Sequence, residues 1–220
     1  MTMTDQDLRI KHDVEAELEW EPSVDARLIG VAVTDGIVTL TGEVSSFAQK
    51  WNAERAAERV EGVRGVVNEI EVKVTGDRTD ADTARAAVNA LKWNALVPED
   101  RITVKVDDGW ITLKGEVNYD FQRRAAERAV RYLPGVRGIS NLITVKPRVE
   151  PTNIKSKIEE TFKRQAAIDA DNITVEVNGS EVTLRGTVRS WAERREAERA
   201  AWAAPGVTSV KNLITVRAVA

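Results

Sequence analysis

The sequence predicts an α+β protein of three tandem αββαβ units, each a three-stranded mixed sheet with two helices packed on one side. The stretch VTLTGEV at residues 38–44 recurs as ITLKGEV at 111–117 and as VTLRGTV at 182–188, so that its glycines lie 73 and 71 residues apart. Ala-Glu-Arg follows each glycine after eleven residues, Gly-Val after twenty and asparagine after twenty-six. A repeat that holds one register over most of the chain determines the architecture before single elements are assigned.

The first element of each unit is expected to be an amphipathic helix. Its inward positions recur every four residues, which places them on one helical face. They are Ile10, Val14 and Leu18 in the first copy, Thr83, Ala87 and Leu91 in the second, and Ile154, Ile158 and Phe162 in the third.

A β-hairpin is expected next. Apolar residues alternate in two runs, such as 29–33 and 38–44, and the runs are joined by Asp35-Gly36, Asp108-Gly109 or Asn178-Gly179. These dipeptides tolerate the positive φ of tight hairpin turns, so the pattern is a strong hairpin signal.

A second helix and a last strand complete each unit. The inward stripe of this helix is mostly alanine, as in Ala53, Ala56 and Ala57, which predicts that its backbone lies close to the sheet. Gly62, Gly135 and Gly206 end the helix, and the last strands are expected at Val66 to Val74, Ile139 to Val145 and Val210 to Val216. The strand order stays open.

The repeated glycines Gly42, Gly115 and Gly186 are interpreted as structural, at a strand position where the covering helix or a bulge leaves no room for a Cβ atom. Approach of a ligand is the alternative. The expected domains are residues 4–74, 80–146 and 152–217, and their small size favours docking of neighbouring units.

The composition excludes several classes of site. The chain has 42% apolar and 30% charged residues, no cysteine, and His12 as its single histidine. Disulfides and thiolate sites are therefore impossible, zinc and iron sites have almost no ligands, and no cofactor is expected. No nucleophile elbow or phosphate-binding glycine loop is present, so we expect a protein that is not an enzyme.

Charge and hydropathy also bear on location and partners. The net charge of −3 lacks the basic footprint of a nucleic-acid binder, so no nucleic acid is expected. The polar residues 1–8 do not form a secretory signal, and no apolar run reaches the length of a transmembrane segment. We therefore expect a cytoplasmic protein.

The repeated strand with its glycine, the alanine-rich helix, Gly-Val and the asparagine-led strand together resemble the BON domain family (bacterial OsmY and nodulation). The resemblance covers nearly the whole chain and places Gly42, Gly115 and Gly186 on the hallmark glycine of the family. It implies the αββαβ fold, a bacterial source, and a non-enzymatic role linked to osmotic or general stress. It also implies binding of phospholipid or envelope partners, although the family is often periplasmic and this sequence shows no export signal.

The second unit carries the candidate surface for anionic phospholipid or a protein partner. Residues 77–148 hold 13 basic and 10 acidic side chains, a net of +3. The candidate residues are Trp93, Trp110, Arg123, Arg124, Arg128 and Arg131. Ion pairing on a solvated helix face is the alternative for the arginines, and packing of a helix end onto the sheet is the alternative for Trp93 and its counterpart Trp20. For Trp51, Trp191 and Trp202, on the second helices, we expect capping or contacts between domains.

Two further functions stay open. The resemblance also implies, as one alternative, a cytoplasmic protein that senses potassium or another cation. The first unit is acidic, with 8 basic and 15 acidic side chains in residues 1–76, which suits a cation. Exposed helix faces would instead suit a protein-interaction or chaperone-like scaffold.

Overall fold

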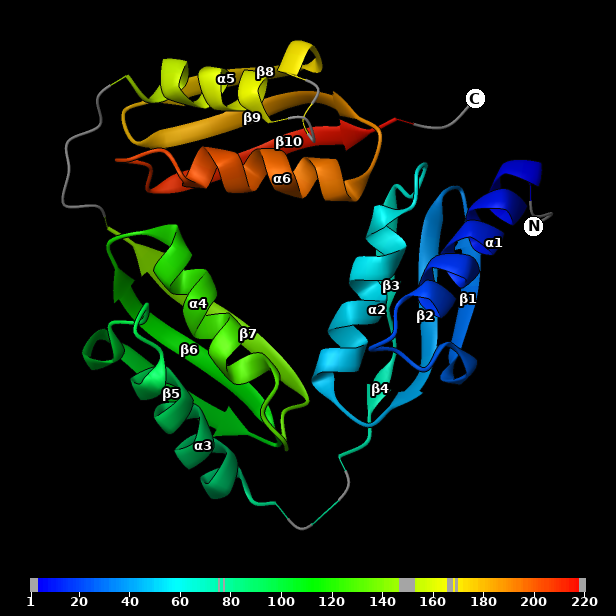
Figure 1. The fold of residues 1–220 in the computed structure, drawn as a ribbon, viewed down its shortest axis with the longest axis vertical. Coiled ribbons are helices and arrows are strands. Elements are labelled where there is room, and N and C mark those ends of the chain that lie inside the picture. The colour runs from blue at the N-terminus through cyan, green and yellow to red at the C-terminus, as the bar shows by residue number, and fades with distance from the viewer. Residues whose placement is uncertain are drawn as a thin grey trace.

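The computed structural model describes residues 4–74, 76, 78–146, 153–165, 168 and 170–217. It contains three αββαβ units with mixed sheets, as the sequence predicts (Figure 1). The first unit comprises α1 (Asp5–Trp20), β1 (Ile29–Thr34), β2 (Ile37–Val44), α2 (Phe47–Arg59), β3 (Gly65–Asn68) and β4 (Glu71–Val72). The second comprises α3 (Asp80–Trp93), β5 (Ile102–Asp107), β6 (Trp110–Val117), α4 (Asp120–Arg131) and β7 (Gly138–Val145). The third comprises α5 (Ile154–Arg164), β8 (Ile173–Asn178), β9 (Glu181–Val188), α6 (Trp191–Trp202) and β10 (Ser209–Val216).

The hairpin strand that carries the repeated glycine is the central strand of each sheet. It runs antiparallel to the first strand and parallel to the last one, which settles the open strand order. In the first unit the expected strand from Val66 to Val74 is instead two short strands, β3 and β4. Both pair with β2 at the same offset, Leu40 with Asn68 and Glu43 with Glu71, so the strand is interrupted and not shifted.

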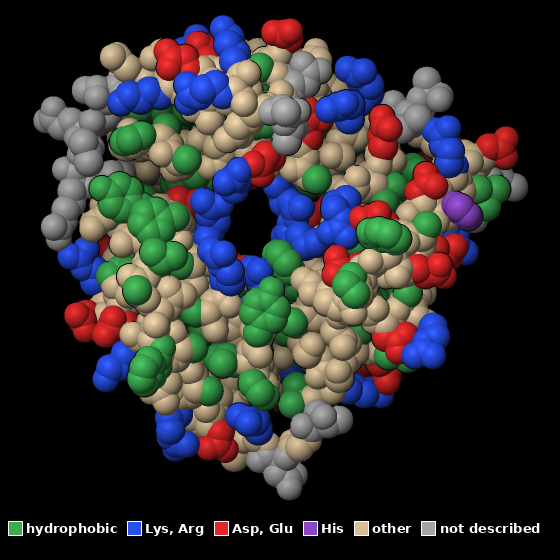
Figure 2. Space-filling model, viewed as in Figure 1, with side chains coloured by type: hydrophobic (Ala, Val, Ile, Leu, Met, Phe, Trp, Pro, Cys, Tyr) green, Lys and Arg blue, Asp and Glu red, His purple; other side chains and the backbone are tan. Residues whose placement is uncertain are grey.

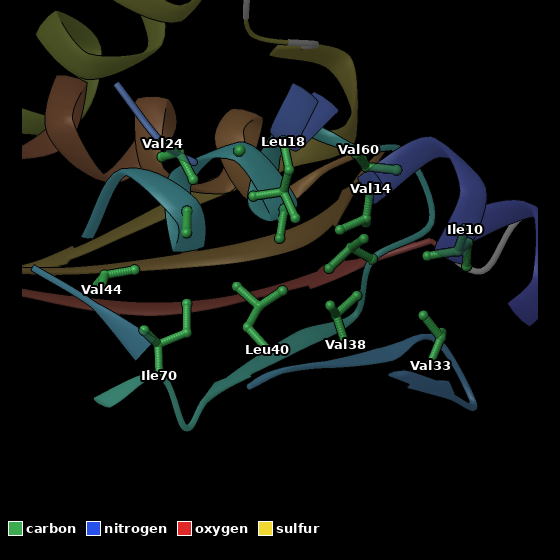
Figure 3. Packing of buried hydrophobic residues seen from close by; sticks show 14 residues of the cluster. Ile10, Val14, Leu18, Val24, Val33, Val38, Leu40, Val44, Val60 and Ile70 are labelled. Atoms are coloured by element: carbon green, nitrogen blue, oxygen red, sulfur yellow. The ribbon is translucent and has the colours of Figure 1, made fainter. Parts of the chain in front are cut away.

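Each core lies between the sheet and its two helices. In the first unit Ile10, Val14 and Leu18 of α1 point toward Val38 and Leu40 of β2 (Figure 3). Ala53, Ala56 and Ala57 of α2 are fully buried against the same sheet, so the close approach that they predict is confirmed. An equivalent cluster fills each of the other units.

The repeated glycine is structural, but its crowding comes from the backbone of the turn that leads into the first strand and not from the covering helix. Gly42 has φ +125°, and an added Cβ atom would lie 2.0 Å from the carbonyl oxygen of Leu28. A Cβ atom added at Gly115 or Gly186 would lie at the same distance from the carbonyl oxygen of Arg101 or Asn172. Only glycine fits, because the position combines positive φ with a neighbouring carbonyl group.

The repeated asparagine joins the last strand to the second helix. In the first unit Asn68 donates from Nδ2 to the carbonyl oxygen of Lys50 at 3.1 Å and to Oε2 of Glu54 at 3.0 Å, while its Oδ1 accepts from the backbone N–H of Ile70. Asn141 and Asn212 make the same three bonds in their units. This network accounts for the glutamate of the repeated Ala-Glu-Arg.

The first helix is tied to the hairpin turn by an aspartate. Asp7 accepts from the backbone N–H of Gly36 at 3.0 Å, and this bond is the main cause that lowers the pKa of Asp7. Asp80 accepts in the same way from Asp108 and Gly109.

Substitution of the repeated glycine tests its structural role. We expect Gly42→Ala to lower the free energy of unfolding of the first unit by about 3 kcal/mol, since the Cβ atom would clash with the carbonyl oxygen of Leu28, directly before the neighbouring strand. Gly65→Ala is the control, because Gly65 has no positive φ and the nearest atom, of Ile37, would lie 3.9 Å away. Urea unfolding followed by circular dichroism measures both, and equal losses would show that crowding at Gly42 is not the cause.

Candidate functional site

The second helices of the units, α2, α4 and α6, face the middle of the molecule and follow one another around it (Figure 1). The end of each helix meets the beginning of another, so the three units close into a ring. In Figure 2 an opening passes through the middle, and Lys and Arg side chains border it.

The third unit meets the first through α6 and α2. Trp191, at the start of α6, packs against the core of the first unit. Arg195 donates to Oε2 of Glu58, which also accepts from Nη1 of Arg55 at 2.7 Å. The Glu58 side chain is only 9% exposed, so one buried carboxylate holds two guanidinium groups from two different units.

The first unit meets the second through a tryptophan and an arginine. The guanidinium group of Arg131, in α4, lies 3.6 Å from the ring centroid of Trp51, in α2. Arg131 also pairs with Glu127 at 2.7 Å. Phe47, at the start of α2, packs against the core of the second unit. A cation above a half-buried indole ring is the favourable geometry for this interaction.

The second unit meets the third around Trp202, at the end of α6. Trp202 packs against the cores of both units, and Arg123 of α4 lies 4.5 Å from its ring centroid. Asp120, whose side chain is 2% exposed, pairs with Arg123 and with Nε of Arg124. Asp120 holds the repeat position of Phe47 and Trp191, and a cavity of about 150 Å³ lies beside it.

The contacts therefore reuse the same repeat positions with different chemistry. At two interfaces, the residue nine positions after the glycine of one unit contacts the residue sixteen positions after the glycine of another. These pairs are Trp51 with Arg131 and Arg195 with Glu58. At the third interface Trp202 holds position sixteen, and the stacking arginine is Arg123, one residue before position nine. The expected inter-domain role of Trp51, Trp191 and Trp202 is confirmed.

The structure divides the candidate residues of the second unit among three places. Arg123, Arg124 and Arg131 lie where units meet, and Arg128 lies exposed on α4. Trp93 and Trp110 are 86% and 50% exposed.

Trp93 and Trp110 do not lie side by side. Trp93 ends α3, whereas Trp110 follows the turn that Asp80 holds at the start of α3. The 14 residues of α3 separate these ends by about 20 Å. Trp110 is further fixed by a 2.8 Å bond from its Nε1 to Oγ of Ser140.

The alternative that Trp93 and Trp20 pack a helix end onto the sheet is wrong. Trp20 is 82% exposed and Trp93 is 86% exposed, although both occupy the same place in their units. Both side chains therefore project into solvent from the ends of their helices.

Sequence reasoning missed the two buried acids, Glu58 and Asp120. Burial raises the pKa of Glu58 to about 7, and Glu54 adds to the rise, while Arg55 and Arg194 oppose it. The available signal was Asp120 standing in the repeat position that Phe47 and Trp191 occupy in the other units.

In the part of the chain that the structure describes, no helix is long and apolar enough to cross a membrane. The same residues include no group of three or more acidic or histidine side chains placed to hold a metal ion.

Comparisons with known proteins find a family that matches each unit and a relative of most of the chain. Residues 6–74, 79–147 and 151–218 each match the model of the BON domain family. The osmotically-inducible protein Y of Escherichia coli (strain K12) is 30% identical over 146 residues, which cover 64% of this chain and 73% of that protein.

Among solved structures, CdsD, a structural protein of the type III secretion system of Chlamydia trachomatis, is 14% identical and matches with a TM-score of 0.26. The match covers 94% of this chain and 92% of that chain. The PrgH periplasmic domain is 10% identical, with 87% and 95% covered and a TM-score of 0.21. Such low TM-scores say nothing about what this chain binds.

Removal of Trp202 tests the interface between the second and third units. We expect Trp202→Ala to lower the free energy of unfolding by about 3 kcal/mol, since this ring packs against two cores. We also expect a larger radius of gyration in small-angle X-ray scattering, because the closed arrangement of the three units would open at this contact. Trp93→Ala, at an 86% exposed site, should change stability by no more than about 0.5 kcal/mol. An unchanged scattering profile for Trp202→Ala would contradict closure at this contact.

Glu58 gives stability a specific pH dependence. The folded chain keeps the Glu58 proton up to about pH 7, whereas the unfolded chain releases it near the ordinary pKa of 4.5. As pH rises from about 4.5 to about 7, the free energy of unfolding should therefore fall, and above about pH 7 it should level off. Urea unfolding of the wild type and of Glu58→Gln over pH 4–8 measures the difference, which should narrow toward low pH. A constant difference would contradict the raised pKa.

Proposed function

The chain belongs to the BON domain family, and we propose that it is a non-enzymatic binding protein of osmotic stress that attaches to anionic phospholipid surfaces through the loop after α3. The stress association is supported by the osmotically-inducible relative of Escherichia coli, which is 30% identical. The observation that carries the proposal is the exposure of Trp93 in a unit of positive net charge.

The loop after α3 presents a small apolar tip. Trp93 is 86% exposed, Leu96 is half-exposed, and Ala95 between them is exposed as well. An indole ring with apolar neighbours at a loop tip suits the headgroup region of a bilayer, where one part of the ring stays wet.

The charge of the second unit favours anionic lipid over neutral lipid. Residues 77–148 carry a net charge of +3, of which α4 supplies +2 at the centre of the ring, and beside the tip Lys92 is exposed directly before Trp93. The attraction acts over a Debye length of about 8 Å at physiological salt. Because only one tryptophan and a few apolar groups insert, the attachment is shallow and reversible.

The first unit offers a natural comparison at the same repeat position. Trp20 is as exposed as Trp93, but Glu19 and Glu21 flank it, and Pro22 and Ser23 stand where the second unit has Ala95 and Leu96. Residues 1–76 carry a net charge of −7, which repels an anionic surface. Trp20 therefore lacks both features that support binding by Trp93.

Vesicle co-sedimentation of two matched variants tests this function. We expect the wild type to sediment with anionic vesicles at low salt, and Trp93→Ala to lose most of that binding. Trp20→Ala should bind like the wild type, although it removes the same side chain at equal exposure. Equal loss in both variants, or no sedimentation of the wild type, would contradict the proposal.

A further inference from the structure

We propose that the opening at the centre of the ring is a second binding site, which takes a soluble anion bearing several phosphate groups. It is separate from the loop after α3, because the side chains concerned belong to α2, α4 and α6. The site arises only when the three units close, since each unit contributes part of its border.

The inner helices carry more basic than acidic side chains. Their basic residues are Lys50, Arg55, Arg59, Arg123, Arg124, Arg128, Arg131, Arg194, Arg195 and Arg199. Their acidic residues are Glu54, Glu58, Asp120, Glu127, Glu193, Glu196 and Glu198. Figure 2 shows that Lys and Arg side chains border the opening, so the excess positive charge gathers there.

Pairing at the interfaces leaves part of this charge uncompensated. Glu58 is shared by Arg55 and Arg195, and Asp120 is shared by Arg123 and Arg124. One carboxylate between two guanidinium groups leaves one positive charge at each place. Protonation of Glu58, whose pKa burial raises to about 7, leaves two positive charges there. The shared carboxylate also holds the guanidinium groups in position before a ligand arrives, which lowers the entropy cost of binding.

The repeated Ala-Glu-Arg supplies one further arginine from each unit. Its alanine is buried in the core and its glutamate holds the repeated asparagine, but neither role involves the arginine. The arginine takes no part in the core or in the asparagine network of its own unit, which leaves it available to a ligand at the centre of the ring.

Arg55 shows where this arginine lies. It contacts Trp51, with its guanidinium group 4.8 Å from the ring centroid, and it pairs with Glu58. Trp51 also contacts Arg131 of the second unit, and Glu58 also pairs with Arg195 of the third unit. Arg55 therefore lies between the two neighbouring units, at the inner side of the ring.

Arg128 and Arg199 hold the position of Arg55 in α4 and α6, and both are exposed. Among the described residues Arg128 has no hydrogen bond or ion pair, and Arg199 pairs with Glu196 on its own helix. The pKa of Glu196 is lowered mainly by Arg199 and also by Arg124 of the second unit. Arginines of two units therefore lie near the same carboxylate.

The chemistry of guanidinium groups favours phosphate as the anion. Arginine binds phosphate oxygens through paired N–H donors, and several arginines on different helices suit an anion with several such groups. Because the opening is bordered by charged side chains and open to solvent, a soluble anion can reach it and a bilayer cannot.

Calorimetric titration of the full chain with sodium tripolyphosphate at low salt tests the site. We expect saturable binding of one anion per chain, and a rise in Tm when the anion is present. The double variant Arg128→Gln/Arg199→Gln should bind about tenfold more weakly. Both side chains are exposed, and circular dichroism checks that the variant is folded.

The control is Arg85→Gln/Arg164→Gln, which removes the same charge from exposed sites on the outer helices α3 and α5. It should bind tripolyphosphate like the wild type. If both double variants bound tripolyphosphate equally weakly, the loss of affinity would come from net charge alone, and the proposal would be overturned. An absence of saturable binding by the wild type would also overturn it.

Two further arms distinguish this site from vesicle binding. Inorganic phosphate should bind more weakly than tripolyphosphate, because it engages fewer arginines. Arg128→Gln/Arg199→Gln should still sediment with anionic vesicles, whereas Trp93→Ala should keep its affinity for tripolyphosphate. If Arg128→Gln/Arg199→Gln lost vesicle binding and the wild type did not bind tripolyphosphate, the two arginines would bind lipid headgroups. The proposal would then be wrong.

Discussion

The end-to-end contact of the second helices is the constraint on which the whole arrangement depends. Each unit is small and builds a single thin core between a three-stranded sheet and two helices. Phe47, Trp191 and Trp202 each pack against the core of a neighbouring unit, so burial is shared around the ring. Because the two termini of every second helix are engaged, the central opening and its basic border follow from closure itself.

Closure also explains why the copies differ where they do. The residues that build one unit are repeated with little change: the glycine beside a carbonyl group, the buried alanines and the asparagine bonded to a glutamate. The residues that join units vary, since position sixteen after the glycine is Glu58, Arg131 or Trp202. Distinct partners at equivalent positions specify which unit meets which, and unlike contacts disfavour wrong pairings.

Much of the fold could be predicted from the sequence because its signals are local. Helical periodicity, turn dipeptides and the threefold register locate the elements of every unit. The interfaces are not local: Glu58 and Arg195 pair across 137 residues, and no pattern near either one indicates the other. For the same reason Arg123 and Arg131 read as surface arginines, although they stack on Trp202 and Trp51. The crowding of Gly42 by the carbonyl group that directly precedes the adjacent strand depends on strand pairing and was equally hidden.

The most direct test of the account is the distance between the first and third units, which closure brings together. Cysteines introduced at Glu61 and Ala192, two residues that line the same cleft of about 450 Å³ between these units, can carry the only spin labels in a chain without cysteine. Double electron–electron resonance should then give one narrow distribution at short distance. A broad distribution reaching the separations of an open string of domains would contradict the ring, and with it the central site.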